Sequence, residues 1–104
     1  MSKTLVEKIR AKIEENGGAQ VGDKMIRKVL SYVPEMTDAA RRDSHVALEF
    51  GEPNDARCDE NGSISLCWSK PDEYKVTLSL GTHGGARYDG IFTMREKIKA
   101  MRWL

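Results

Sequence analysis

The sequence predicts an α+β domain in which a four-stranded antiparallel sheet is covered on one face by two N-terminal helices and a C-terminal helix. Segments in the middle of the chain alternate apolar and polar residues, which is typical of strands with one buried and one solvated face. Segments at both ends carry apolar residues at helical spacing. Consecutive strands between helices indicate a single two-layer domain over residues 1–104, in the order α-α-β-β-β-β-α.

The two N-terminal helices are bounded by capping and terminating residues. Thr4 and Glu7 have the spacing of a capping box, and the first helix is expected to end at residues 16–18, where two glycines follow Asn16. The second helix is expected to begin at Asp23 and to end at Pro34, because proline cannot continue a helix from its interior.

A short helical turn and four strands are expected in the central part of the chain. The turn covers residues 37–42, and the strands cover residues 44–50, 63–69, 74–80 and 86–92. Hairpin turns are expected at Asn61-Gly62 and at Pro71-Asp72. The alternation assigns four aromatic residues to the buried face: Trp68, Tyr74, Tyr88 and Phe92. The outer face of the sheet is therefore expected to lack aromatic residues on which bases could stack.

The last helix is expected to follow a second capping box, formed by Thr93 and Glu96. Met94, Ile98 and Met101 lie at helical spacing and are assigned to its buried side. Its outer side is expected to carry four cations: Arg95, Lys97, Lys99 and Arg102. Trp103 lies off the centre of the apolar stripe, and this leaves a core role and an interface role open.

Composition excludes several classes of function. The chain has 104 residues, and its 17 basic and 16 acidic residues leave a formal net charge of +1, without the excess of a dedicated nucleic-acid binder or mimic. No apolar run has the length of a membrane span and no signal peptide is recognisable, so a soluble intracellular protein is expected. Cys58 is expected opposite Ile64 and out of reach of Cys67, and unpaired cysteines fit a cytoplasmic location.

No spacing of residues in the sequence indicates a catalytic centre. His45 and His83 are the only histidines, and no pair of Cys or His residues has the spacing of a structural zinc site, so neither a metal nor a cofactor is expected. The glycine-rich segment 81–87 matches no nucleotide-binding pattern and is expected to be a turn. A small enzyme that uses His45 or His83 with Asp43 or Asp89 remains an alternative.

The candidate contact residues are mainly cations on the expected helices. Either helix face could meet an acidic protein surface or phosphates, so a nucleic-acid-binding regulator is also an alternative. The set comprises Lys24, Arg27, Lys28, Arg87, Arg95, Lys99, Arg102 and Trp103. An exposed edge strand would in addition permit a homodimer.

The hairpin segments carry a resemblance. An Asp-x-x-Gly turn at residues 59–62 leads into a strand that ends at Trp68; strand 74–80 and Tyr88-Asp-Gly90 follow. This arrangement resembles small phage and prophage α+β proteins of unknown function. The resemblance implies no catalytic residue. It implies a non-catalytic inhibitor that blocks a host defence or regulatory complex, such as a CRISPR effector, so the expected partner is a host protein or protein–nucleic-acid complex.

Overall fold

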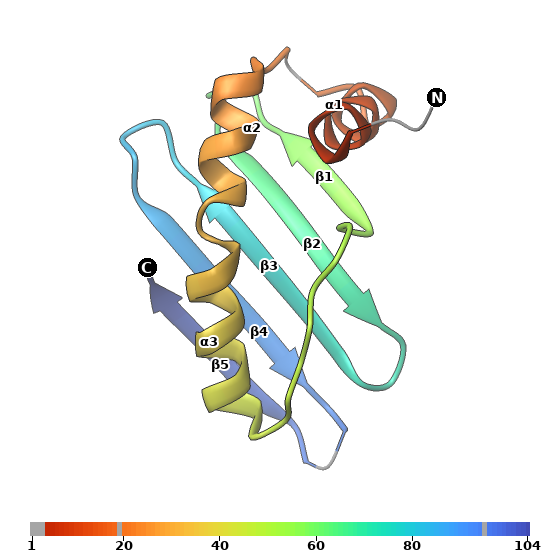
Figure 1. Cartoon of the computed structure of the whole chain (residues 1–104), viewed down its shortest axis with the longest axis vertical. Helices are drawn as coiled ribbons and strands as arrows, with labels where there is room; N and C mark the ends of the chain where they lie inside the picture. Colours follow the sequence, from red (N-terminus) through yellow and green to blue (C-terminus); the bar gives the residue numbers. More distant parts are fainter. Residues whose placement is uncertain (1–3, 19, 95) are drawn as a thin grey trace.

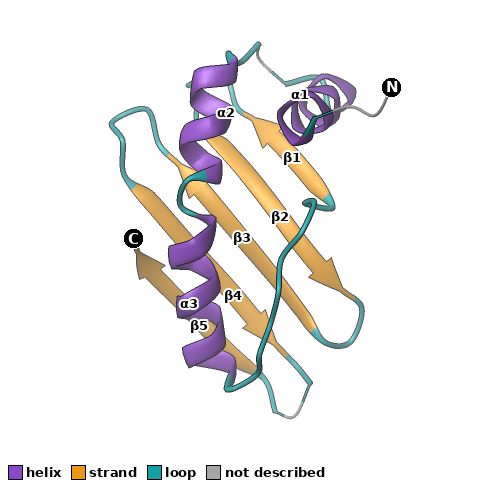
Figure 2. Ribbon diagram, in the orientation of Figure 1, coloured by secondary structure: helices purple, strands orange, loops and turns teal. Residues whose placement is uncertain are grey.

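One layer of helices covers one face of an antiparallel sheet (Figure 1). The computed structural model describes residues 4–18, 20–94 and 96–104. In these residues the elements are α1 (Leu5–Glu15), α2 (Asp23–Leu30), α3 (Val33–Ser44), β1 (Asp55–Cys58), β2 (Ile64–Lys70), β3 (Tyr74–Leu80), β4 (Ala86–Phe92) and β5 (Ile98–Trp103). The strands form a single antiparallel sheet in the order β1-β2-β3-β4-β5, and the opposite face carries no helix of the described chain (Figure 2).

The α+β class is confirmed, but the predicted arrangement of four strands and a C-terminal helix is wrong. The sheet formed by the described residues has five strands, and its first strand, β1, lies where the sequence predicted a loop. The Asp59 carboxylate accepts hydrogen bonds from the backbone N–H groups of Asn61 (2.9 Å) and Ser63 (3.0 Å), which closes the turn to β2. Cys58 pairs with Ile64, as predicted.

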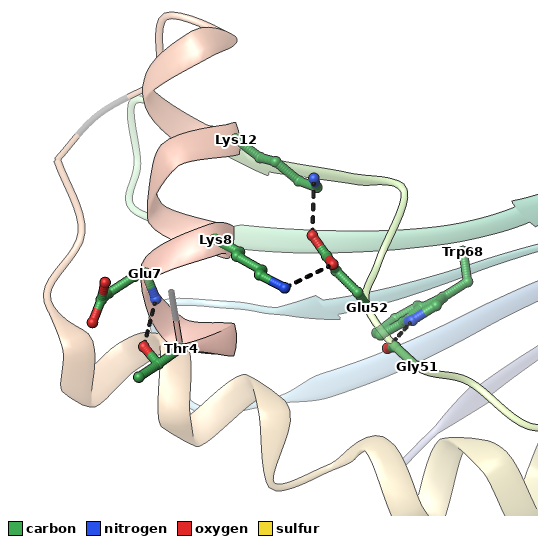
Figure 3. A network of polar contacts seen from close by, with 7 residues as sticks. All are labelled: Thr4, Glu7, Lys8, Lys12, Gly51, Glu52 and Trp68. Carbon is green, nitrogen blue, oxygen red and sulfur yellow. Dashed lines mark hydrogen bonds and ion pairs between the residues drawn. The ribbon is translucent and has the colours of Figure 1, made fainter. Parts of the chain in front are cut away.

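The helical layer begins as predicted and then departs from the prediction. The Thr4 hydroxyl accepts a hydrogen bond from the Glu7 backbone N–H (3.2 Å), which confirms the first helix start (Figure 3). Only two residues separate α2 from α3, so the two form one bent helix. Pro34 lies in the first turn of α3, where a backbone N–H would have no acceptor within α3, so proline is accommodated there and the predicted end of the second helix at Pro34 is wrong. The predicted turn over 37–42 is part of this 12-residue helix.

The predicted strand over residues 44–50 is wrong. Ser44 belongs to α3, and His45 ends that helix with a φ of 58°. The chain then runs as an extended connection along the helical side of the sheet to β1 (Figure 1). Leu48 is buried against the core, which explains the alternation. A periodicity of two records which side chains are buried, and it does not require a hydrogen-bonded neighbouring strand.

Side-chain contacts fix this connection to the rest of the molecule (Figure 3). The Trp68 indole N–H donates to the Gly51 carbonyl oxygen over 2.8 Å. The Phe50 ring meets the Trp68 ring edge-on with centroids 5.9 Å apart. Glu52 accepts hydrogen bonds from Lys8 (3.5 Å) and Lys12 (3.3 Å) of α1. The connection therefore joins α1 to the core around Trp68.

Strands β2, β3 and β4 confirm the predicted alternation. Their apolar residues face the helices and form the core together with Ile9 and Ile13 of α1, Ile26 and Val29 of α2 and Met36 of α3. Trp68, Tyr88 and Phe92 are buried in this core and Tyr74 packs against it, so the assignment of these four aromatic residues is confirmed.

The predicted C-terminal helix is wrong, because residues 98–103 form β5 and pair with β4. Ile98 lies opposite Phe92 and Ala100 lies opposite Gly90, so both residues face the helical layer. Thr93 and Glu96 lie in the connection between the strands. The spacing of Met94, Ile98 and Met101 suits a helix, but a short connection returns this segment to the free edge of β4, where every second residue of β5 forms backbone hydrogen bonds with β4.

Candidate partner-binding surface

The helix-free side of the sheet, called here the open face, is built from residues that alternate with the core. Residues paired across the strands form rows. One row runs Arg57, Ser65, Ser79, Arg87 and Trp103, and a second runs Asp55, Cys67, Thr77, Asp89 and Met101. The side chains in the middle of the open face are therefore small and mostly polar, and the large apolar side chains of this face lie towards β5.

Three apolar residues on the open face form the Trp103 patch, defined as Ile91, Met101 and Trp103. Trp103 is 71% exposed, Met101 is 61% exposed and Ile91 is 37% exposed. Ile91 and Met101 line the same shallow depression, together with Lys75 and Lys99. Single exposed apolar residues are ordinary, whereas a cluster that includes tryptophan makes this part of the open face a candidate contact surface.

The expectation that the outer face lacks aromatic residues is wrong because of Trp103. The indole lies beside the β3–β4 turn, since a Cβ atom at Gly85 would stand 3.5 Å from the Trp103 ring. The error follows from treating residues 98–103 as a helix, which placed Trp103 away from the sheet. The signal that could have found it is the alternation of Lys99, Met101 and Trp103 with Ile98 and Ala100.

The charges on the open face are unevenly compensated. Arg87 pairs with Asp89 over 3.1 Å, and Arg57 pairs with Asp55 over 3.0 Å. The Asn16 side-chain amide and then the Arg57 guanidinium lower the pKa of Asp55 below its ordinary value. In the described part of the chain, neither Lys75 nor Lys99 has an ion-pair partner. Uncompensated positive charge therefore flanks the Trp103 patch.

The structure divides the predicted contact residues between two layers. Arg87, Lys99 and Trp103 lie together on the open face. Lys24, Arg27 and Lys28 are exposed on α2, which belongs to the helical layer on the opposite side of the sheet (Figure 1). Arg95 lies outside the described residues.

Arg102 points to the helical side and is occupied by an ion pair. Its guanidinium holds the Asp43 carboxylate in a forked contact, with the Arg102 Nε 2.9 Å from the Asp43 Oδ2. This hydrogen bond lowers the pKa of Asp43 and raises that of Arg102. Burial, reinforced by the nearby Asp43 carboxylate, raises the pKa of Tyr88. The cluster joins α3 to β5 and leaves Arg102 engaged within the protein.

Acid should weaken this joint between α3 and β5. Because the folded-state pKa of Asp43 lies below the unfolded value of about 3.9, its stabilising contribution is present above that pH and is lost as the pH falls through the folded pKa. We expect Asp43→Asn to be less stable at neutral pH and to lose less stability between about pH 5 and pH 2. Urea unfolding at each pH, with Glu49→Gln as control, measures this. An unchanged pH slope in Asp43→Asn would contradict the assignment.

The structure separates the two histidines of the enzyme alternative and pairs both of its aspartates with arginines. His45 follows the C-terminal end of α3, and His83 lies in the β3–β4 turn at the opposite end of the sheet (Figure 1). Asp43 is paired with Arg102 on the helical side, and Asp89 is paired with Arg87 on the open face. The described residues contain no cluster of three or more His, Cys, Asp or Glu side chains that could hold a metal ion.

Three further predictions concern the cysteines, a membrane-spanning segment and the resemblance to other proteins. Cys58 is buried on the helical side and Cys67 lies on the open face; both are free. None of the described helices has the length and apolar composition needed to cross a membrane. Comparison of the chain with protein-family models, with curated proteins and with solved structures gives no match. The resemblance to phage and prophage proteins therefore stays a prediction.

Proposed function

We propose that this chain is a non-catalytic binding protein that docks a partner protein on the open face at the Trp103 patch. The observation that carries this proposal is the 71% exposure of Trp103 beside Met101 and Ile91. Tryptophan buries a large apolar area on association and is enriched among the residues that dominate binding energy. An apolar centre that includes tryptophan and methionine, with a polar and solvent-accessible rim, is the ordinary arrangement of a protein interface.

A protein partner suits this surface better than a nucleic acid. A surface for single-stranded nucleic acid needs several aromatic residues and a continuous positive groove, whereas the described part of the open face carries Trp103 alone. Asp55 and Asp89 also neutralise two of its arginines, Arg57 and Arg87. Binding of nucleic acid to the cations of α2 stays a prediction.

Blocking of a host defence or regulatory complex is the activity that we propose for this docking, on the strength of the sequence resemblance alone. We also propose a cytoplasmic location, because unpaired cysteines are typical of a reducing compartment. Neither is needed for the docking surface itself, which rests on Trp103, Met101 and Ile91.

The test is a comparative pull-down with tagged protein from the cells in which the chain occurs. We expect wild type to recover a stoichiometric partner, and Trp103→Ser to lose most of it, because truncation of a central tryptophan costs about 2–4 kcal/mol of binding free energy. Lys24→Ser, on the helical layer, is the matched control and should retain the partner. A partner retained by Trp103→Ser and lost by Lys24→Ser would overturn the proposed surface.

A further inference from the structure

In the described part of the chain, β5 is an edge strand with no further strand beside its outward backbone groups. Leu104 N–H donates to the Ala86 carbonyl oxygen over 2.9 Å. Because hydrogen-bonded pairs alternate along an antiparallel ladder, every second residue of β5, starting at Ile98, directs its N–H and C=O groups to β4. The backbone groups of the residues between them point to the free edge of the sheet. These residues are Lys99, Met101 and Trp103.

The opposite edge of the sheet is covered. α1 packs against β1, and the Asn16 side-chain amide donates to the outward carbonyl oxygen of Ala56 over 2.9 Å. The chain at Gly18 also lies close to β1, since a Cβ atom there would stand 2.9 Å from the Cys58 carbonyl oxygen. Proteins commonly protect sheet edges in this way. Of the two edges formed by the described residues, the β5 edge is therefore the one open to another strand.

The residues of β5 whose backbone groups point outward place two apolar side chains and one lysine on the open face. Trp103 and Met101 are the two most exposed large apolar side chains among the described residues, and Lys99 follows at the same spacing. Lys75 and Lys99 add positive charge with no ion-pair partner in the described chain. Across an antiparallel strand pair, directly opposite side chains contact each other, and opposite charges are favourable.

We propose that the partner adds an extended segment to β5 as a sixth antiparallel strand, with two apolar residues opposite Trp103 and Met101 and an acidic residue opposite Lys99. The inference rests on the proposed function and specifies the binding mode of the same surface. Backbone hydrogen bonds to Lys99, Met101 and Trp103 supply the attachment, and the alternate side chains supply the selectivity. An antiparallel direction continues the order of the whole sheet.

The test uses a short capped peptide in which threonines alternate with a valine, a leucine and a glutamate, in that order from the N-terminus. Labelled peptide is titrated with the full chain and fluorescence anisotropy is measured. We expect saturable binding, weakened about three- to tenfold when glutamate is replaced by lysine. N-methylation of the leucine, whose N–H would point to β5, should weaken binding at least about tenfold, whereas N-methylation of a neighbouring threonine should change it little.

Variants of the protein test the same bonds from the other side. Met101→Pro removes an outward N–H and keeps the bonds between β4 and β5, since this N–H points away from β4. We expect it to bind the peptide at least about tenfold more weakly than Met101→Ala, which lacks the same side chain. Lys99→Pro against Lys99→Ala repeats the comparison if Met101→Pro fails to fold.

Several results would overturn the added strand. These are no peptide binding at millimolar concentration, equal effects of the two N-methyl groups, or self-association of the chain through β5 that excludes the peptide. The proposed function fails separately, because its pull-down depends on Trp103 whatever the binding mode. Partner recovery that needs Trp103 but tolerates Met101→Pro would keep the docking surface and remove the added strand.

Discussion

Trp68→Ala is expected to cost about 3–5 kcal/mol of the free energy of unfolding, the largest loss among the substitutions considered. Trp68 is 3% exposed, its ring meets Phe50 edge-on, and its indole N–H is bonded to Gly51. The substitution opens a core cavity and releases the connection that also holds α1 through Glu52. A domain of this size has a total stability of about 5–15 kcal/mol, so the variant should be close to unfolding at 37 °C.

Urea unfolding of matched tryptophan variants measures this loss. Trp103→Ala removes the same side chain from an exposed position and should change the free energy of unfolding by less than about 0.5 kcal/mol. Trp68→Phe keeps an aromatic ring and loses the hydrogen bond to Gly51, and about 1–2 kcal/mol is expected. Equal losses in Trp68→Ala and Trp103→Ala would mean that the two faces of the sheet have been assigned incorrectly.

Gly90→Ala is expected to destabilise the fold by about 1–3 kcal/mol through overpacking. Gly90 is buried in the middle of β4, and the rings of Tyr88 and Phe92 fill the space above it. An added Cβ atom would lie 2.6 Å from the Tyr88 hydroxyl oxygen and 2.8 Å from two carbons of the Phe92 ring. Both rings lie inside the core, so neither can move away without disturbing the side chains packed around it.

Gly51→Ala is the matched control, because an added Cβ atom at Gly51 meets no described atom within 4 Å. We expect the free energy of unfolding of this variant, measured in urea, to equal that of wild type within about 0.5 kcal/mol. Thermal unfolding followed by circular dichroism should rank the proteins in the same order. A Gly90→Ala protein as stable as Gly51→Ala would contradict the packing of Tyr88 and Phe92 over β4.

The central hairpins could be predicted from the sequence because local and long-range requirements agree there. Strands β2, β3 and β4 each have seven residues, short turns between them and neighbours on both sides. Their alternation therefore reports burial and strand pairing together. Residues 44–50 alternate for burial alone, since Leu48 contacts the core while the backbone has no strand beside it.

The C-terminal segment shows the opposite error. Met94, Ile98 and Met101 suit a helix in isolation, and strand pairing with β4 decides otherwise. Pairing depends on residues distant from the segment, so the spacing within the segment alone, which suits either a helix or a strand, could not decide between them. Because the pairing of β5 with β4 was not predicted, the Trp103 patch was predicted only in part. Arg87, Lys99 and Trp103 were candidate contacts, but Met101 was assigned to the buried side of a helix. Exposure at β5 follows from its place at the edge of the sheet, which the sequence does not state.

The central claim, that the open face at β5 is the binding surface, is tested most directly by site-specific photo-crosslinking in the cells in which the chain occurs. A photoreactive benzoylphenylalanine replaces Trp103 in one protein and Lys24, on the helical layer, in a matched control. Illumination is followed by detection of covalent products of the chain. The account predicts a discrete crosslinked partner from position 103 and none from position 24. Products from position 24 with none from position 103 would contradict it.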